Sequence, residues 1–239
     1  MGATISILRR ELGAYFNTPI GYVFMVFFLL LTCTFYVSTL FDQGVVEMRN
    51  YFGLMPIFLL IFVPAVSMRL WAEERKLGTL EVLMTLPVKT WQAVTGKFGA
   101  GLIFIALWFV LTFPIPLTLM WLGKPDMGPI VCGYLGTMML AMIYLSIGAF
   151  ASSLTSDQIV GFVIGCSINF VFFLLSFQPF LELIRDYSPP VADLVAQFGV
   201  EYHFESISRG VVDSRDIIYG LSVTALFLFL NTLVIERRR

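Results

Sequence analysis

The sequence predicts an all-α, polytopic membrane protein that folds as one transmembrane domain over residues 1–239. Hydrophobic residues make up 58% of the chain and charged residues 13%, whereas a soluble domain usually carries about 25% charged residues. Several runs lack Asp, Glu, Lys and Arg over lengths near the roughly 20 residues that a membrane-spanning helix needs. We therefore expect six transmembrane helices, at residues 20–41, 51–70, 98–122, 129–154, 158–178 and 217–235.

Residues 1–19 precede the first span and are expected to form an interfacial helix. Apolar side chains recur at helical spacing from Ile5 to Phe16, with arginines on the polar side. A short amphipathic helix with a basic face tends to lie in the plane of the membrane interface. Pro19 should end this helix, because proline interrupts a continuing one.

Prolines and small residues distinguish the next spans. Pro56 and Pro64 lie inside the second span and predict kinks, which neighbouring helices tolerate in lipid. Pro114 and Pro116 predict a distortion of the third span. The fourth span is rich in glycine, alanine and serine, which permit close helix packing, and a short turn at 155–157 joins it to the fifth.

The distribution of lysine and arginine predicts the orientation. The N-terminus, the region 71–97, the turn 155–157 and the C-terminus together hold about twice as many positive residues as the opposite side. Cytoplasmic loops carry such an excess. We expect a multi-pass protein of the cell (inner or plasma) membrane with both termini in the cytoplasm, and no basic patch that would bind nucleic acid.

The segment 71–97 is expected to contain a short cytoplasmic helix across the ends of the second and third spans. Gly78 can end one helix and Thr79 can cap the next, and Glu81 would lie in its first turn, where the helix dipole favours an anion. Pro87 should end it. Its apolar face would consist of Leu77, Leu80, Leu83 and Met84. From the residues alone, docking into a groove of a soluble partner and an ordinary solvated loop remain equal alternatives.

The loop 179–216 is predicted to form two short amphipathic helices that dip into the outer leaflet. Apolar residues recur at helical spacing from Val191 to Phe198 and from Phe204 to Val211. One interpretation is a lid over the exit of a translocation path. The candidate gate residues are then His203, Phe204, Glu205, Ser206 and Arg209. The alternative is a purely structural re-entrant hairpin.

Two polar residues need separate interpretation. His203 is the only histidine, and without a carboxylate or cysteine cluster beside it in sequence we expect a structural or interfacial role rather than metal binding or catalysis. Asn169 lies inside the fifth span. It is expected to form a helix-packing hydrogen bond, with the lining of a path as the alternative.

The run Glu73 to Val88, E-E-R-K-L-G-T-L-E-V-L-M-T-L-P-V, followed by W-Q-A-V-T-G-K-F from Trp91, resembles the cytoplasmic loop of ABC-2-type permeases. A second segment, residues 202–216 (Y-H-F-E-S-I-S-R-G-V-V-D-S-R-D), resembles the segment before the last span in the gliding-motility (GldF-like) branch of that family. The first motif is moderately specific to the superfamily and the second is more specific to the branch. The resemblance covers essentially the whole chain.

This resemblance implies a permease subunit that pairs with a second permease chain, as homodimer or heterodimer, and is driven by separate ABC ATPase subunits, with export as the favoured direction. It also implies that the helix at 79–86 is a coupling helix. The implied ATPase-coupling residues are Glu73, Glu74, Arg75, Gly78, Thr79, Leu80, Glu81, Leu83 and Pro87. No cofactor is expected on this chain, since ATP would bind to the partner.

The sequence also bears on enzymatic function. The pair Gly96–Lys97 is followed by Phe98, so it is not part of a G-x-x-x-x-G-K-[ST] phosphate-binding loop. No catalytic motif is present, and we expect no enzymatic activity. Two other functions remain open as alternatives: a non-transporting anchor, mechanotransmission or assembly subunit of an ATPase-linked complex, and, less favoured, a membrane-embedded enzyme.

Overall fold

The computed structural model describes residues 2–44, 47–85 and 88–237, and within these ranges every regular element is a helix. The all-α fold class is therefore confirmed. In chain order the helices are α1 (Gly2–Asn17), α2 (Pro19–Gln43), α3 (Arg49–Ser67), α4 (Arg69–Lys76), α5 (Thr79–Thr85), α6 (Thr90–Leu111), α7 (Pro114–Leu122), α8 (Met127–Leu154), α9 (Gln158–Leu174), α10 (Gln178–Arg185), α11 (Pro189–Phe198), α12 (Val200–Ser208) and α13 (Ser214–Glu236).

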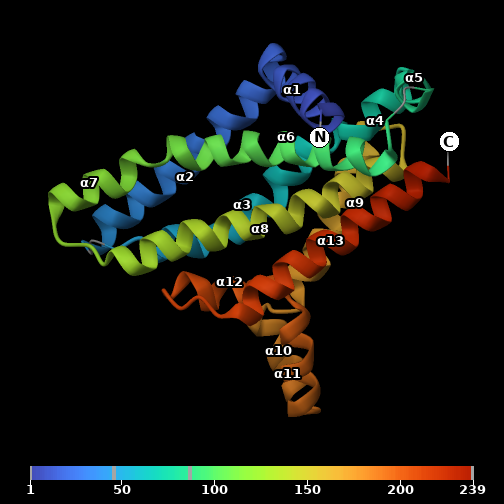
Figure 1. The fold of residues 1–239 in the computed structure, drawn as a ribbon. Helices are drawn as coiled ribbons and strands as arrows, with labels where there is room; N and C mark the ends of the chain where they lie inside the picture. Colours follow the sequence, from blue (N-terminus) through green and yellow to red (C-terminus); the bar gives the residue numbers. More distant parts are fainter. Residues whose placement is uncertain (1, 45–46, 86–87, 238–239) are drawn as a thin grey trace.

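The long helices form a bundle with α1, α4, α5 and both chain ends gathered at one end and α7 at the other (Figure 1). Among the described residues, five helical runs are long and apolar enough to cross a membrane, and the bent pair α9–α10 makes a sixth candidate. The expectation of a polytopic membrane protein with six spans is thus met by five continuous runs and one bent pair.

The fifth span differs from its predicted bounds of 158–178, because α9 ends at Leu174 and α10 leaves it at 54°. The 17 residues of α9 rise only about 26 Å, against about 30 Å of hydrocarbon. Pro179 explains the break: it lies in the first turn of α10, where its missing N–H costs nothing, whereas inside a continuing helix it would remove a hydrogen bond.

The second span runs through both of its prolines as α3 and breaks at Met68 instead. Pro64 cannot donate to the carbonyl of Leu60, and the thiol of Cys166 on α9 lies 3.6 Å from that oxygen. At the break, the hydroxyl of Ser152 on α8 donates to the Met68 carbonyl at 2.7 Å. The hydroxyl oxygen of Ser152 in turn accepts the backbone N–H of Trp71 at 3.1 Å. A side chain inserted into the helix ladder is a recognised cause of such a bend.

The helix α8 forms the centre of the bundle and packs against α3, α9, α12 and α13. Its glycines let these neighbours approach. A Cβ added at Gly148 would lie 2.0 Å from Ser67 Oγ, and one at Gly133 would lie 2.4 Å from the ring of Phe52. The small residues predicted for the fourth span therefore line its contacts with α3.

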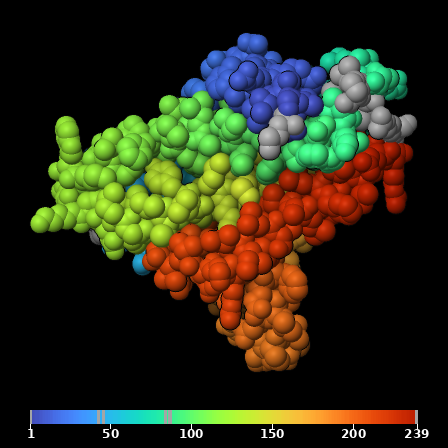
Figure 2. Space-filling view, viewed as in Figure 1, coloured from blue at the N-terminus to red at the C-terminus, as the bar shows by residue number. Residues whose placement is uncertain are grey.

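The loop before the last span contains three helices, α10, α11 and α12, where two were expected. The two predicted helices correspond to α11, which includes Val191 to Phe198, and to α12, which includes Phe204. The third helix, α10, is additional to the prediction, which ends the fifth span at residue 178 and expects no separate helix directly after it. Figure 2 shows the α10–α11 hairpin standing clear of the bundle, while α12 packs on α8.

Candidate functional site

The candidate site lies where α1, α4, α5 and α6 meet, at the end of the bundle that holds both termini (Figure 1). The helix α1 packs along α6 because Gly96 leaves room for it. A Cβ at Gly96 would lie 3.0 Å from the Thr4 carbonyl oxygen and 3.1 Å from Ile7 Cγ2. Tyr15 of α1 stacks on Phe104 of α6 with ring centroids 4.7 Å apart, which fixes the position of α1.

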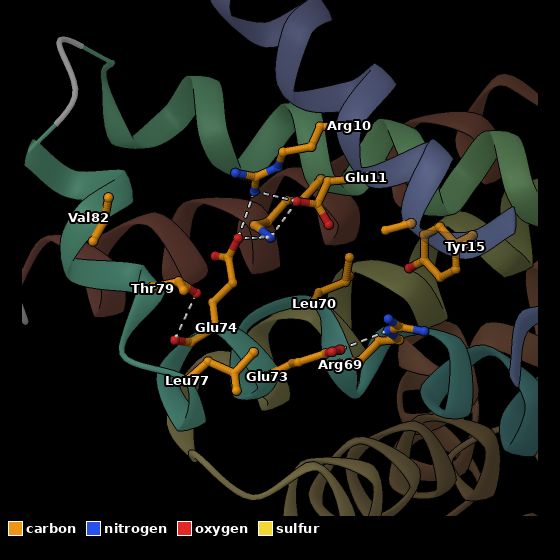
Figure 3. A pocket seen from close by; sticks show the side chains of 12 residues that line it. Arg10, Glu11, Tyr15, Arg69, Leu70, Glu73, Glu74, Leu77, Thr79 and Val82 are labelled. Carbon is orange, nitrogen blue, oxygen red and sulfur yellow. Dashed lines mark hydrogen bonds and ion pairs between the residues drawn. The ribbon is translucent and has the colours of Figure 1, made fainter. Parts of the chain in front are cut away.

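Four charged side chains join these helices, and we call them the charge quartet: Arg10, Glu11, Glu74 and Lys97. Lys97 Nζ lies 3.0 Å from Glu11 Oε1 and 3.0 Å from Glu74 Oε1. Arg10 Nη2 lies 2.6 Å and 2.7 Å from the same two oxygens (Figure 3). The Lys97 side chain is 2% exposed and its ammonium lies 5.0 Å from the centre of the Trp71 ring. The quartet thus ties α1, α4 and α6 together.

The electrostatics of the quartet follow from burial and charge. Burial raises the pKa of Glu11, but Lys97 and Arg10 outweigh burial and hold that pKa below its ordinary value. The pKa of Arg10 is lowered by burial and raised more by Glu11 and Glu74, so it ends above its ordinary value. The second oxygen of Glu74 is buried with no hydrogen-bond partner among the described residues. Each cation of the quartet therefore contacts both carboxylates, and Lys97 is the member most removed from solvent.

The turn between α4 and α5 is set by Gly78, whose φ of +71° is a left-handed conformation that suits glycine. Thr79 does not cap α5 as expected. It is the first residue of the helix, and its hydroxyl donates back to the carbonyl of Glu74 at 3.3 Å. Glu81 lies in the first turn, as predicted. The turn therefore fastens α5 to the residue that contributes to the charge quartet.

Two other predicted coupling residues point elsewhere. Glu73 pairs with Arg69 at 3.0 Å, one turn away on α4. Arg75 donates from Nη1 to the carbonyl of Ser153 at 3.0 Å, near the end of α8. Hence only Glu74 of the predicted charged trio enters the quartet, while Arg75 links the base of α5 to the central helix.

The apolar side chains of α5 and its approach are largely open. Leu77 is 68% exposed and Val82 is 63% exposed, and Leu80 is half-buried. Leu83 lies within α5, although its side chain is outside the described part of the structure, and Pro87 lies outside the described residues altogether. Exposed apolar side chains therefore lie on α5, at Val82, and on the turn that leads into it, at Leu77.

A cavity of about 490 Å³ opens between these helices. Its apolar lining comes from Ala14, Tyr15, Leu70, Leu77 and Val82, and its charged rim from Arg10, Glu11, Arg69, Glu73, Glu74 and Lys97. Figure 3 shows these side chains converging from three sides on the space between α1 and the α4–α5 turn.

Sequence reasoning did not assign the quartet residues Arg10, Glu11 and Lys97 to the coupling site. Lys97 and Glu11 are 86 residues apart, and no local pattern pairs them. One signal was available. Lys97 lies seven residues inside a helix that begins at Thr90, and a lysine at that depth needs a buried counterion.

The predicted gate residues share α12 but have different surroundings. His203 is buried and hydrogen-bonded through both ring nitrogens. Phe204 is 3% exposed and belongs to the core against α8. Glu205 and Arg209 form an exposed ion pair, and Ser206 lines a cavity of about 720 Å³ together with His203. Phe204 is thus a packing residue. The other four residues line the cavity beside α13.

Asn169 on α9 is fully buried, and both of its amide atoms lack hydrogen-bond partners among the described residues. The helix-packing hydrogen bond expected for it is not formed within those residues. In the ranges that the structure describes, no three His, Cys, Asp or Glu side chains gather closely enough to hold a metal ion.

Residues 63–190, more than half of the chain, match the family model described as ABC-2 family transporter protein. The match includes α4, α5, α6 and the central α8, and so covers most of the joint described above. A comparison with curated proteins finds no significant match.

Proposed function

The chain belongs to the ABC-2 family of transporter proteins, and from this premise we propose that it builds a translocation path together with a second permease chain and is driven by ATPase subunits on separate polypeptides. Membership makes it the membrane permease component of an ABC transporter. The pairing, the identity of the ATPase and an outward direction of transport are parts of the proposal. No cofactor is assigned to this chain, and ATP is proposed to bind to the partner.

The observation that carries the proposal is the joint between α1, α4, α5 and α6. The α4–α5 turn with exposed Leu77 and the short helix α5 with exposed Val82 lie beside a cavity. The charge quartet links that region to α1 and to the base of α6. A push on α5 would therefore reach two other helices through buried contacts. We propose that α5 is the coupling helix and that the cavity receives apolar side chains of the ATPase.

The proposed orientation places this end of the bundle in the cytoplasm of the plasma (inner) membrane. Both termini lie at the same end as α5 (Figure 1), and the lysine and arginine excess supports a cytoplasmic location for it. Affiliation with the gliding-motility (GldF-like) branch is proposed on the resemblance of residues 202–216 alone.

The test is co-purification of the tagged chain from native membranes, with identification of bound proteins and an ATPase assay. Leu77→Asp is expected to abolish ATPase association, because it places a charge at the mouth of the cavity. Leu183→Asp on α10 is the matched control, since Leu183 is 65% exposed and far from α5. Recovery of the native chain without an ATPase, or retention of the ATPase by Leu77→Asp, would overturn the proposal.

A further inference from the structure

The end of α11 is held by three side chains from three different segments. Its last turn presents the carbonyl groups of residues 196–198 in succession. Ser176, after α9, lies 3.3 Å from the first carbonyl oxygen, His203 Nε2 of α12 lies 3.0 Å from the second, and the hydroxyl of Tyr219 on α13 lies 2.6 Å from the third. Carbonyls at a helix C-terminus need such external donors. These three hydrogen bonds therefore attach the end of α11 to the segments around it.

The ring of His203 is bound on its other side as well. Its Nδ1 lies 2.7 Å from Asp216 Oδ1, and the two side chains are only 9% and 6% exposed. A backbone carbonyl is only an acceptor, so Nε2 must carry a hydrogen to bond with Gln197. Nδ1 and the carboxylate then need a second proton between them. The pair holds one proton more than a neutral imidazole beside an ionised carboxylate would.

The helix ends favour the ionic form of this pair. The ring lies at the C-terminus of α11, where the helix dipole favours a cation, and Asp216 lies in the first turn of α13, where it favours an anion. The ring of Tyr219 stacks on the imidazole, with centroids 4.0 Å apart, and an aromatic face attracts a cation. These three effects act in the same direction, toward an imidazolium and a carboxylate.

Other titratable or charged groups around the ring come from α12, α13 and the segment between them. They are Tyr202, Glu205, Arg209, Asp213, Arg215 and Tyr219. Glu205 pairs with Arg209, and Asp213 accepts the backbone N–H of Arg215. Asp216 is therefore the carboxylate in contact with the ring. Glu201 also lies on α12. Burial and then the charge of Glu205 raise the pKa of Glu201 to about 7.

We propose that His203 and Asp216 form a proton-dependent clasp that fastens the end of α11 to the start of α13. With the proton bound, the ring donates to both Gln197 and Asp216. When the proton leaves, a neutral ring keeps only one N–H, so two acceptors face each other at one of the two contacts. One contact between the end of α11 and the start of α13 is then lost, while the Tyr219 hydrogen bond to Phe198 remains. The pH on that side of the membrane therefore sets how firmly the α10–α11 hairpin is held.

The direct test uses the fact that the chain has one histidine. Histidine labelled with ¹⁵N in the ring reports this site alone by NMR on the native chain in phosphatidylcholine–phosphatidylglycerol nanodiscs. At pH 7.5, about one unit above the ordinary pKa of a free imidazole, we expect two protonated ring nitrogens. A ring with a single N–H at pH 7.5 and pH 6.5 would overturn the proposal.

Hydrogen exchange tests the release of the hairpin. After correction for intrinsic exchange, the amides of residues 190–199 in the native chain are expected to exchange about tenfold faster at pH 9 than at pH 6, because one buried hydrogen bond is lost. Asp216→Asn should lose the pH dependence and exchange slowly at both values, because its amide N–H can donate to Nδ1 of a neutral ring whose Nε2–H still bonds to Gln197. Asp213→Asn should match the native chain, since asparagine caps a helix as well as aspartate does. Equal corrected rates at pH 6 and pH 9 in the native chain would contradict the clasp, whether or not the variants fold.

Discussion

Replacement of Lys97 by methionine is expected to destabilise the protein and to loosen α1 from α4. The ammonium is 2% exposed and is the shared partner of two carboxylates that are 14% and 15% exposed. Removal of one member of a buried ion pair costs about 3–5 kcal/mol, because the opposite charge stays buried. Arg10 still contacts both carboxylates in this variant, so the lower end, about 3 kcal/mol, applies here.

The assay is thermal unfolding of the purified chain in lipid nanodiscs. For a chain of this length, about 3 kcal/mol corresponds to a fall in Tm of roughly 6–12 °C. Arg10→Met is the matched control. The Arg10 side chain is 52% exposed, and an exposed ion pair contributes only about 0–1 kcal/mol.

The comparison of the two variants carries the argument. A Tm for Lys97→Met within about 2 °C of the native value would refute the reasoning, because it corresponds to less than about 1 kcal/mol. An equal fall for Arg10→Met would refute it as well, since burial would then not decide the cost. If α1 is also released, its residues should become more accessible to hydrogen exchange in Lys97→Met alone.

Three further predictions concern other parts of the molecule. Gly148→Ala should lower the free energy of unfolding by about 1–3 kcal/mol in the same thermal assay, because the added Cβ would lie 2.0 Å from Ser67 Oγ, whereas Gly53→Ala, with no atom within 4 Å of the added Cβ, should not. The pKa of Glu201 is raised from its ordinary value to about 7. The protonated carboxyl group therefore stabilises the folded state fully below pH about 4.5, and this stabilisation is lost as the pH rises through 7. Glu201→Gln should flatten the dependence of Tm on pH between 5 and 8. Gly78→Ala should cost about 1 kcal/mol at a φ of +71° and reduce ATPase stimulation in the co-purified complex, and unchanged stimulation would argue against a role of the α4–α5 turn in coupling.

The sequence predicted those features that have a local signal. Long uncharged runs indicated the membrane helices, and Gly78 marked the break between α4 and α5. Each of these depends on residues within one or two helical turns.

Pairings across the fold left no such signal. Glu11 and Lys97 meet only because Gly96 lets α1 approach α6, and His203 meets Asp216 only because α12 folds back on α13. His203 was interpreted as isolated, since no carboxylate cluster lies beside it in sequence. The end of α9 was misplaced because an apolar run continues past Leu174, and hydropathy does not register the bend before Pro179.

The rim of the cavity beside α5 carries three cationic and three anionic side chains, paired with one another. These paired charges largely cancel one another, so the rim itself adds little to the attraction of a partner from solution. A protein that docks there would be held at the rim by burying apolar area rather than by charge. Once the partner is bound, the contacts at the rim should therefore weaken little between low and physiological ionic strength, in contrast to contacts between unpaired opposite charges.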